Sequence, residues 1–362
     1  MNHWKETAEI LSRLAELKAA GRRAALATVV RIVGSGYRRP GAKFLIEDTG
    51  STLGSVSGGC LEADVREVAR AVMETGTPSL RHYSTGADED VVWGLGLGCN
   101  GLVDVFIQPA TEGPLAELAD RLRELLAGDS PFAILTVVEG EGSGATLVLG
   151  PEGTDGTLGS AELDRLAAEA ARGLLPGGRS AVQTVDGRGI FVEVQPPPPH
   201  LIVCGAGDDA RPLVAYAADA GFRVTVIDHR PALLDPTWFP QAAQRLLGRP
   251  EDPGIVPPPA ARSLAVVKTH SLLHDREWTR RLLAAGLPYV GLLGPRARTE
   301  SILREIGTGP TEMERVFGPV GLDLGADGPR QVALAIVAEL LAFIAQREPR
   351  HLSERKEPIH AA

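Results

Sequence analysis

Two of the three cysteines lie in glycine-rich segments, where a thiol has the chemistry to contact a metal ion or a sulfur atom. Cys60 follows Ser57, Gly58 and Gly59 and directly precedes a helix expected over 62–74. The amides of a glycine turn and of a helix start converge there, and a helix N-terminus favours the thiolate form of cysteine. Cys60 is therefore a candidate metal or sulfur contact. A small buried cysteine at a helix start would give the same pattern, so this segment alone leaves both alternatives open.

The second of these thiols, Cys99, follows Gly98 in a segment where glycines alternate with leucines. Alternating glycines leave one side free for the approach of another backbone or of a flat ligand. The separation of Cys60 and Cys99 is not typical of zinc ligands. A second thiol beside such a turn favours a pocket that both cysteines face.

Two arginines offer a site for an anion. Arg38 and Arg39 lie among glycine and proline residues in the segment 34–41. Guanidinium groups bind phosphate through paired hydrogen bonds, which suits anion capture. A solvated loop would look similar, so this segment indicates a binding site only in combination with the cysteine segments.

A G-x-G-x-x-A turn begins at Gly205, between an expected strand and an expected helix. Gly205 and Gly207 would let the backbone approach a phosphate at the helix N-terminus. Asp228, at the end of the next strand, is placed to bind a ribose hydroxyl. A tight turn without a ligand is the alternative, and Asp208 and Asp209 favour it because carboxylates at a helix start compete with an anionic ligand.

Polar residues also follow the later strands of this region. His270 ends one expected strand, with His274 and Asp275 close behind, and Arg296 and Arg298 follow the next. Ligands of open α/β sheets bind outside the carboxyl ends of the strands. A single histidine at a strand end is more often structural, but several polar groups at successive ends favour a cleft.

These residues need a scaffold that brings strand ends and helix starts together. The prolines at 196–199 cannot continue a helix or a central strand, so they mark a linker. After them, strands alternate with helices, which predicts a parallel sheet. We therefore predict an α/β protein with an N-terminal mixed α/β domain plus a C-terminal Rossmann-type doubly wound parallel sheet. Strands are expected over 25–31, 43–47 and 102–107 before the linker, and over 201–204, 222–227, 264–267 and 289–293 after it.

The expected domain boundaries follow from these elements. The segment 111–195 has no motif with recognisable chemistry and reads as a helix, two or three strands and another helix. We assign an N-terminal domain to 1–110, an α/β extension of unknown role to 111–195, the linker to 196–199, the Rossmann-type domain to 200–348 and a polar tail to 349–362.

Composition excludes several classes of protein. The 362 residues are 44% hydrophobic and 23% charged, which is typical of a globular chain of two or three domains. The net charge of −9 disfavours general nucleic-acid binding. Three sparse cysteines do not form a disulfide framework, and we find neither a signal-peptide pattern nor an apolar run long enough to cross a membrane. We therefore expect a cytoplasmic protein that binds neither nucleic acid nor membranes.

Taken in order, the clusters resemble the XdhC/CoxI family, the xanthine dehydrogenase accessory proteins. The resemblance is specific because motifs of both halves occur together. It covers about 22–110 and 200–348, and it leaves the middle segment without a matching motif. The matching segments are 34–35, 39–42, 54–60, 96–99, 205–207, 269–270, 291–294 and 319–325.

The resemblance implies a cofactor chaperone rather than a turnover enzyme. It implies binding of the molybdenum cofactor (molybdopterin), support of its sulfuration, and delivery to the apoenzyme of a xanthine dehydrogenase-type molybdenum hydroxylase, with a cysteine desulfurase as a further partner. Cys60 and Cys99 would then contact or shield the molybdenum or its sulfur, while Arg38, Arg39 and the glycine turns would hold the phosphate. We expect a homodimer, because a symmetric interface would shield such a cofactor.

Two other functions stay open at this point. An NAD(P)-dependent oxidoreductase would use Gly205, Gly207 and Asp228 for its nucleotide, with His270 near the reaction. A non-catalytic regulator would use the same turn to sense a nucleotide. We find no lysine–tyrosine or histidine–carboxylate pair that completes a hydride-transfer site, which favours the accessory function. The chain departs from the family pattern at Pro295, where a serine is usual, and over 271–274, where the usual stretch is more polar.

Overall fold

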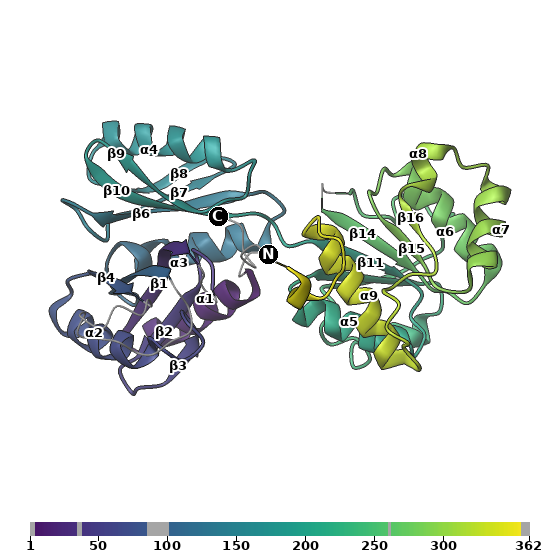
Figure 1. The fold of residues 1–362 in the computed structure, drawn as a ribbon, viewed down its shortest axis with the longest axis horizontal. Coiled ribbons are helices and arrows are strands. Elements are labelled where there is room, and N and C mark those ends of the chain that lie inside the picture. Colours follow the sequence, from purple (N-terminus) through teal and green to yellow (C-terminus); the bar gives the residue numbers. More distant parts are fainter. Residues whose placement is uncertain (1–3, 35–37, 85–100, 260–261, 356–362) are drawn as a thin grey trace. The chain divides into compact units, whose positions relative to one another are not determined.

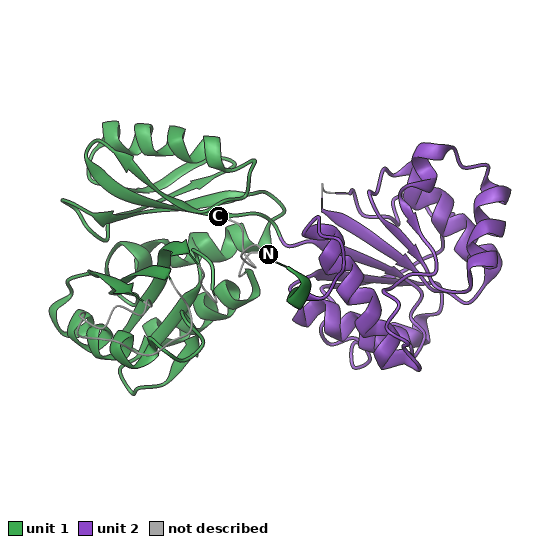
Figure 2. Ribbon diagram, in the orientation of Figure 1, with its two compact units in different colours: residues 1–197, 352–362 green, residues 198–351 purple. Residues whose placement is uncertain are grey.

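The computed structural model describes residues 4–34, 38–84, 101–259 and 262–355. The chain divides into two compact units (Figure 2): unit 1 comprises residues 1–197 and 352–362, and unit 2 comprises residues 198–351. The division falls inside the proline run that we interpreted as a linker. Within the described ranges, no helix is both long and apolar enough to cross a membrane.

Unit 1 consists of two halves with the same connectivity (Figure 1). In each half a helix precedes three strands, a second helix and two further strands. The two antiparallel sheets, ordered β3-β2-β1-β5-β4 and β8-β7-β6-β10-β9, correspond strand for strand. The first half contains α1 (Trp4–Ala19), β1 (Ala24–Gly34), β2 (Lys43–Glu47), β3 (Thr52–Gly54), α2 (Glu62–Thr75), β4 (Ser79–Ser84) and β5 (Gly101–Pro109). The second contains α3 (Gly113–Ala127), β6 (Phe132–Glu139), β7 (Thr146–Gly150), β8 (Gly153–Thr157), α4 (Ala161–Leu174), β9 (Ala181–Val185) and β10 (Arg188–Gln195).

The central strands of unit 1 are largely apolar because helices cover both faces of each sheet. In β1, Ala25, Ala27 and Val29 belong to the core under α2, while Leu26 belongs to the core formed with α1 and α3. Figure 1 shows α1 and α3 between the two sheets, with α2 and α4 on the outer faces. Burial on both faces explains why β1 reads as a continuous apolar run rather than as an alternating strand.

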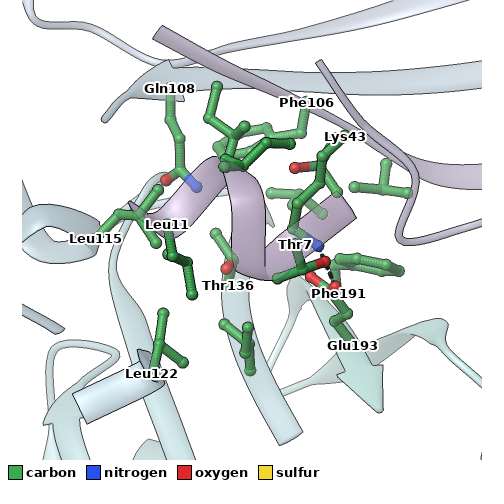
Figure 3. A pocket seen from close by; sticks show the side chains of 16 residues that line it. Thr7, Leu11, Lys43, Phe106, Gln108, Leu115, Leu122, Thr136, Phe191 and Glu193 are labelled. Atoms are coloured by element: carbon green, nitrogen blue, oxygen red, sulfur yellow. Dashed lines mark hydrogen bonds and ion pairs between the residues drawn. The ribbon is translucent and has the colours of Figure 1, made fainter. Parts of the chain in front are cut away.

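The middle layer of unit 1 encloses a cavity of about 30 Å³ (Figure 3). Apolar side chains such as Leu11 and Phe106 form most of its lining, and Thr7 adds a hydroxyl. The buried ammonium of Lys43 in β2 pairs with Glu193 in β10, which joins the two halves. A cavity of this volume holds about one or two water molecules, so it is too small for an organic cofactor.

Unit 2 contains a parallel sheet with the strand order β13-β12-β11-β14-β15-β16, the order of a Rossmann fold. β12 and β13 lie on one side of β11, whereas β14, β15 and β16 lie on its other side, so the strand order switches direction between β11 and β14. The strands are β11 (His200–Cys204), β12 (Arg223–Asp228), β13 (Gln244–Leu247), β14 (Ser263–Val267), β15 (Val290–Leu292) and β16 (Val316–Phe317). The helices are α5 (Ala210–Asp219), α6 (Leu272–Ala284), α7 (Arg296–Ile306), α8 (Pro310–Met313) and α9 (Pro329–Ile344), with short 3₁₀ turns at Pro231–Leu233 and, in unit 1, Leu352–Glu354.

Alternate residues of β11, a central strand of unit 2, face the helices on opposite sides of the sheet. Leu201 and Val203 pack into the core shared with α5 and α9, whereas Ile202 and Cys204 pack into the core shared with α6. Burial raises the pKa of the Cys204 thiol well above its ordinary value. Cys204 is therefore a core residue. The predicted Rossmann-type parallel sheet is confirmed.

The prediction of two or three strands for 111–195 is wrong, because this segment forms the five strands β6–β10. The short edge strands β13 and β16 were also not expected. β8 reads Gly-Thr-Asp-Gly-Thr and is largely exposed, and β13 is a partly exposed edge strand. Backbone hydrogen bonds to a neighbouring strand define such elements, so their own side chains carry little signal.

Candidate functional site

The loop before α2 folds around the carboxylate of Glu62, the first residue of that helix. Oε1 of Glu62 accepts hydrogen bonds from Ser55 Oγ at 2.8 Å and from the amides of Val56 and Ser57 at 3.1 and 3.0 Å. Oε2 accepts hydrogen bonds from the Gly59 amide at 2.9 Å and from the Ser57 hydroxyl. The amides that we expected to hold an external anion therefore hold a carboxylate of the chain.

Glu62 is buried and ionised. Burial raises the pKa of its carboxyl, but the hydrogen bonds from Ser57 and Ser55 outweigh this effect and lower the pKa from 4.5 to about 2. Its relative exposure is 6%. A charged acceptor with this many donors holds the backbone of its loop in one conformation.

Cys60 presents an exposed thiol on this loop. The buried side chain of Leu61 anchors the chain on one side. On the other side, Gly58 and Gly59 have φ values of +86° and +127°, which side chains rarely tolerate. Among the described residues other than its chain neighbours, no atom lies within 4 Å of the position that a Cβ of Gly59 would take. The exposure of Cys60 favours the contact role over a buried core cysteine.

Arg38 and Arg39, the two candidate arginines, differ in their surroundings. Nη2 of Arg38 donates to both carboxylate oxygens of Glu6 at 2.6 Å, which ties the segment to α1. The ammonium of Lys43 donates to the carbonyl of Gly41 at 3.1 Å. Arg39 carries an exposed side chain. Arg38 therefore pairs with α1, and Arg39 is the more exposed of the two side chains.

The second cysteine segment, with Gly98 and Cys99, lies outside the described residues. A pocket shared by Cys60 and Cys99 stays a prediction. Within the described residues, no group of three or more His, Cys, Asp or Glu side chains is placed to hold a metal ion.

The Rossmann turn of unit 2 has no room for side chains. Gly205 has a φ of +116°, and a Cβ on it would lie 2.5 Å from the carbonyl oxygen of Lys268. A Cβ on Gly207 would lie 2.8 Å from Oδ1 of Asp209. The absence of a side chain at Gly205 therefore allows the ends of β11 and β14 to approach each other closely. The absence of a side chain at Gly207 leaves space that the carboxylate of Asp209 occupies.

Asp228 is the last residue of β12, and both oxygens of its carboxylate accept hydrogen bonds. Oδ2 accepts hydrogen bonds from the Ala206 amide at 2.7 Å and from Arg230 Nη2 at 2.8 Å. Oδ1 accepts hydrogen bonds from the backbone amide and from Nε of Arg230, both at 2.9 Å. Burial raises the pKa of Asp228, but these donors outweigh it and lower the pKa to about 2. A carboxylate has about four acceptor sites, so none remains for a ribose hydroxyl, which disfavours the NAD(P) alternative.

The carboxylate of Asp209 bridges the ends of β11 and β14. Its Oδ2 lies 3.1 Å from Nζ of Lys268 and 3.0 Å from Nε2 of His270. Nζ of Lys268 also donates to the carbonyl of Asp209 at 2.6 Å. Burial lowers the pKa of the Lys268 ammonium, and the neighbouring carboxylate opposes this effect. His270 has an exposed side chain and a φ of +61°.

Arg296 and Arg298, which follow β15, also have different partners. Nη2 of Arg298 lies 2.6 Å from Oδ2 of the buried Asp275. Oδ1 of Asp275 accepts a hydrogen bond from the hydroxyl of Thr269 at 2.6 Å. Arg296 is exposed and pairs with Glu300 on its own helix at 3.1 Å. Arg298, rather than Arg296, is therefore tied to the strand ends.

The structure thus forms two clusters from the predicted residues. Ser57, Gly58, Gly59 and Cys60 share one loop of unit 1. A second cluster lies at the carboxyl edge of the unit 2 sheet and consists of Gly205, Gly207, Asp228 and His270. Arg38 and Arg296 have partners elsewhere.

Sequence reasoning missed Glu62 and Lys268. Glu62 stands three residues after Gly59, a spacing typical of an acidic side chain that reaches back to cap a helix start. Lys268 directly follows an apolar strand, but its partner Asp209 is distant in the sequence.

Comparisons with known proteins identify relatives over nearly the whole chain. Residues 17–84 and 125–186 match the XdhC and CoxI family, and residues 201–340 match the XdhC Rossmann domain. The first match includes much of the middle segment, so the family resemblance extends beyond the motifs found in the sequence.

A Bacillus subtilis (strain 168) protein, named as one of the probable subunits of xanthine dehydrogenase, is 35% identical over 88% of this chain and 92% of its own. The uncharacterized protein YqeB of Escherichia coli (strain K12) is 27% identical over 58% of this chain and 43% of its own. A crystal structure of a Bacillus halodurans protein, described as a xanthine dehydrogenase, superposes with a TM-score of 0.80 at 27% identity, covering 96% of this chain and 97% of that one. The chain belongs to the XdhC and CoxI family.

Proposed function

We propose that this protein binds the molybdenum cofactor, protects it, supports its sulfuration and delivers it to a xanthine dehydrogenase-type molybdenum hydroxylase. The family membership and the relatives named after xanthine dehydrogenase support the link to that enzyme. The observation that carries the site is the exposed thiol of Cys60 on a loop held by Glu62.

The residues around Cys60 fit this cofactor in their donor chemistry. The cofactor carries molybdenum on a dithiolene and a phosphate, and thiolate sulfur is a soft donor suited to such a centre. The Cys60 side chain is exposed, so in the part of the chain that the structure describes a bulky group can reach the thiol. Arg39 has an exposed side chain, and a guanidinium has the chemistry to bind the phosphate.

Each residue of the loop has a distinct part in this proposal. Cys60 contacts or shields the metal or its sulfur, and Glu62 positions the loop without touching the cofactor. The amides of Val56, Ser57 and Gly59 already bind Glu62, so they hold the loop rather than the phosphate. Cys99, Gly98 and Gly58 complete the site as a prediction from the sequence.

The proposal also includes partners. Delivery requires contact with the apoenzyme of the hydroxylase, and sulfuration requires a sulfur donor such as a cysteine desulfurase. A homodimer would shield the bound cofactor from water and oxygen. These partners rest on the family membership.

The test is the cofactor content of the full chain, purified from a host that makes the molybdenum cofactor. We expect molybdenum and pterin to remain with the wild-type protein after gel filtration, and to be reduced in Cys60→Ala and Arg39→Ala. The matched control is Cys204→Ala, because that thiol is fully buried in unit 2. Recovery of a nucleotide without pterin would overturn the proposed function. Wild-type stoichiometry in both Cys60→Ala and Arg39→Ala would show that the site lies elsewhere.

A further inference from the structure

We propose that Lys43 and Glu193 are positioning residues for Arg39, and that they act on the proposed cofactor site without touching the cofactor. This inference rests on the proposed function, because that function gives Arg39 its role as a phosphate contact. It also assigns a part in the site to the segment 111–195, which contains Glu193 and showed no motif with recognisable chemistry.

Arg39 is the first residue of a tight turn that leads into β2. The Ala42 amide donates to the carbonyl of Arg39 at 3.0 Å, and Gly41 has a φ of +96°. A proline followed by a glycine in the left-handed region is typical of a type II turn. The carbonyl of Gly41 accepts a hydrogen bond from Nζ of Lys43 at 3.1 Å. The ammonium of Lys43 therefore holds the last peptide of the turn.

Glu193 holds the ammonium of Lys43 from the second half of unit 1. Its carboxylate pairs with Nζ of Lys43 (Figure 3), and each of the two residues is 4% exposed. Oε1 of Glu193 also accepts a hydrogen bond from Nε2 of Gln195 at 2.6 Å. The same oxygen lies 3.5 Å from where a Cβ of Gly41 would be, so the turn packs against this carboxylate. Because a buried ammonium needs an anionic partner, the position of Lys43 depends on Glu193.

Lys43 also contacts the loop that carries Cys60. The carbonyl of Lys43 accepts a hydrogen bond from the Ser55 amide at 2.9 Å, where this loop leaves β3. A Cβ on Gly54 would lie 2.4 Å from the same carbonyl oxygen, so β2 and the start of the loop approach each other closely. Lys43 therefore contacts the arginine turn through its side chain and the cysteine loop through its backbone.

The second half of unit 1 contains the same turn without the ion pair. In the turn that starts at Gly142, the amide three residues later donates to the Gly142 carbonyl at 2.9 Å. Oγ1 of Thr146 donates to the carbonyl of Gly144 at 3.1 Å, and Thr146 is the first residue of β7, as Lys43 is of β2. A neutral hydroxyl therefore suffices to hold such a turn. A buried ion pair adds little net stability but is costly to break, which suits the positioning of the turn that carries an arginine.

The experiment measures how fast pterin leaves the loaded full chain after dilution, followed by pterin fluorescence. The test variant combines Lys43→Met with Glu193→Gln, because removal of one buried charge alone would leave the other unpaired and could unfold unit 1. Glu193→Gln also keeps an acceptor for Gln195. We expect this variant to release pterin at least about tenfold faster than the wild type, as Arg39→Ala should. Release at the wild-type rate would overturn the proposal.

A combination with Arg39→Ala separates positioning from a general loss of stability. If Lys43 and Glu193 act through Arg39, all three substitutions together should speed release about tenfold, rather than about a hundredfold, because effects on one interaction are not additive. A hundredfold effect would overturn the proposal. Thr146→Val is the matched control, because it removes the equivalent side-chain donor from the other half, and it should leave the release rate unchanged. An equal acceleration in Thr146→Val would also overturn the proposal.

Hydrogen exchange of the chain without cofactor tests the positioning independently of the proposed function. We expect the amides of Gly41 and Ala42 to exchange at least about tenfold faster in the variant with Lys43→Met and Glu193→Gln. The amides of β5 should keep their wild-type protection. Unchanged exchange at 41–42, or an equal loss of protection in β5, would overturn the positioning role. Faster exchange at 41–42 in a chain whose wild type retains no pterin would support the positioning of the turn and refute the proposed function.

Discussion

The starts of α2 and α5 are both preceded by a glycine turn, and at both a carboxylate of the chain takes the place expected for a bound anion. At α2 the donors to Glu62 come from its own loop, namely Ser55, Val56, Ser57 and Gly59. At α5 the donors to the Asp209 carboxylate are side chains at the end of another strand. One contact is local, and the other joins distant parts of the sheet.

The two carboxylates also differ in their exposure and in the kind of donor that they meet. Glu62 is 6% exposed and accepts hydrogen bonds from backbone amides of its own loop. Asp209 is more exposed, and it pairs with the side chains of Lys268 and His270. The same local pattern, a glycine turn before a helix, therefore holds one loop through its own amides in unit 1 and connects side chains that are distant in the sequence in unit 2.

The largest expected effect comes from Glu62→Ala. Loss of the carboxylate removes the acceptor of three backbone amides, so we expect the free energy of unfolding of unit 1 to fall by about 4 kcal/mol. Hydrogen exchange of the unit 1 core measures this change. Glu67→Ala is the control, because Glu67 is an exposed residue of the same helix, and it should change stability by less than about 0.5 kcal/mol. Similar values for both variants would refute the structural role of Glu62.

The pH dependence of the Glu62 contribution should be nearly as large. Because the folded-state pKa lies at about 2, below the ordinary 4.5, the stabilisation is complete above pH 4.5 and is lost as the pH falls toward 2. The shift corresponds to about 3 kcal/mol. The stability difference between the wild type and Glu62→Gln should therefore shrink over this interval in denaturation curves measured at several pH values. A difference that is independent of pH would contradict the ionised state of Glu62.

Asp209→Asn should have a much smaller effect on stability. Lys268 keeps the carbonyl of Asp209 as a partner, and the carboxylate is partly exposed. We expect a loss of about 1 kcal/mol in unit 2, measured by urea denaturation. If the loss matched that of Glu62→Ala, Asp209 would be a structural carboxylate too, and the contrast between the two turns would disappear.

The smallest effect is expected for Cys60→Ser. The thiol is exposed on a loop that Glu62 holds, so the substitution should change the stability of unit 1 by less than about 0.5 kcal/mol. Cys204→Ser is the contrasting variant, because it places a hydroxyl in the core of unit 2, at a cost of about 1–3 kcal/mol. Thermal unfolding of the two variants makes the comparison. A large loss in Cys60→Ser would mean that the thiol supports the loop.

The two halves of unit 1 show how far a shared fold predicts a site. The loop before α2 spans residues 55–61 and carries Cys60, whereas the corresponding loop before α4 spans only residues 158–160. In the second half, Asp164 accepts a hydrogen bond from the Leu158 amide at 2.6 Å, and the side chain of Ser160 caps the N-terminus of α4. Both halves use a carboxylate to support the helix start, but in the described residues only the first presents a thiol.

Much of this could be predicted from the sequence because the signals are local. The apolar runs and glycine turns from residue 200 onward predict the Rossmann-type sheet. The short spacing from Gly59 to Glu62 is a local signal as well, although the role of Glu62 was missed. Strands such as β8 and β13 were missed, because their pairing partners rather than their own side chains define them. The repeated connectivity of unit 1 was missed for the same reason.

The sequence by itself therefore determined that Cys60 stands on a glycine turn at a helix start and that Gly205 and Gly207 form a Rossmann turn. Only the tertiary structure decided which anion each turn holds. Glu62 reaches amides a few residues away, but Asp209 meets Lys268 and His270 across 59 and 61 positions of sequence. Parallel strands bring their carboxyl ends together regardless of their distance along the chain, and that juxtaposition has no local signal.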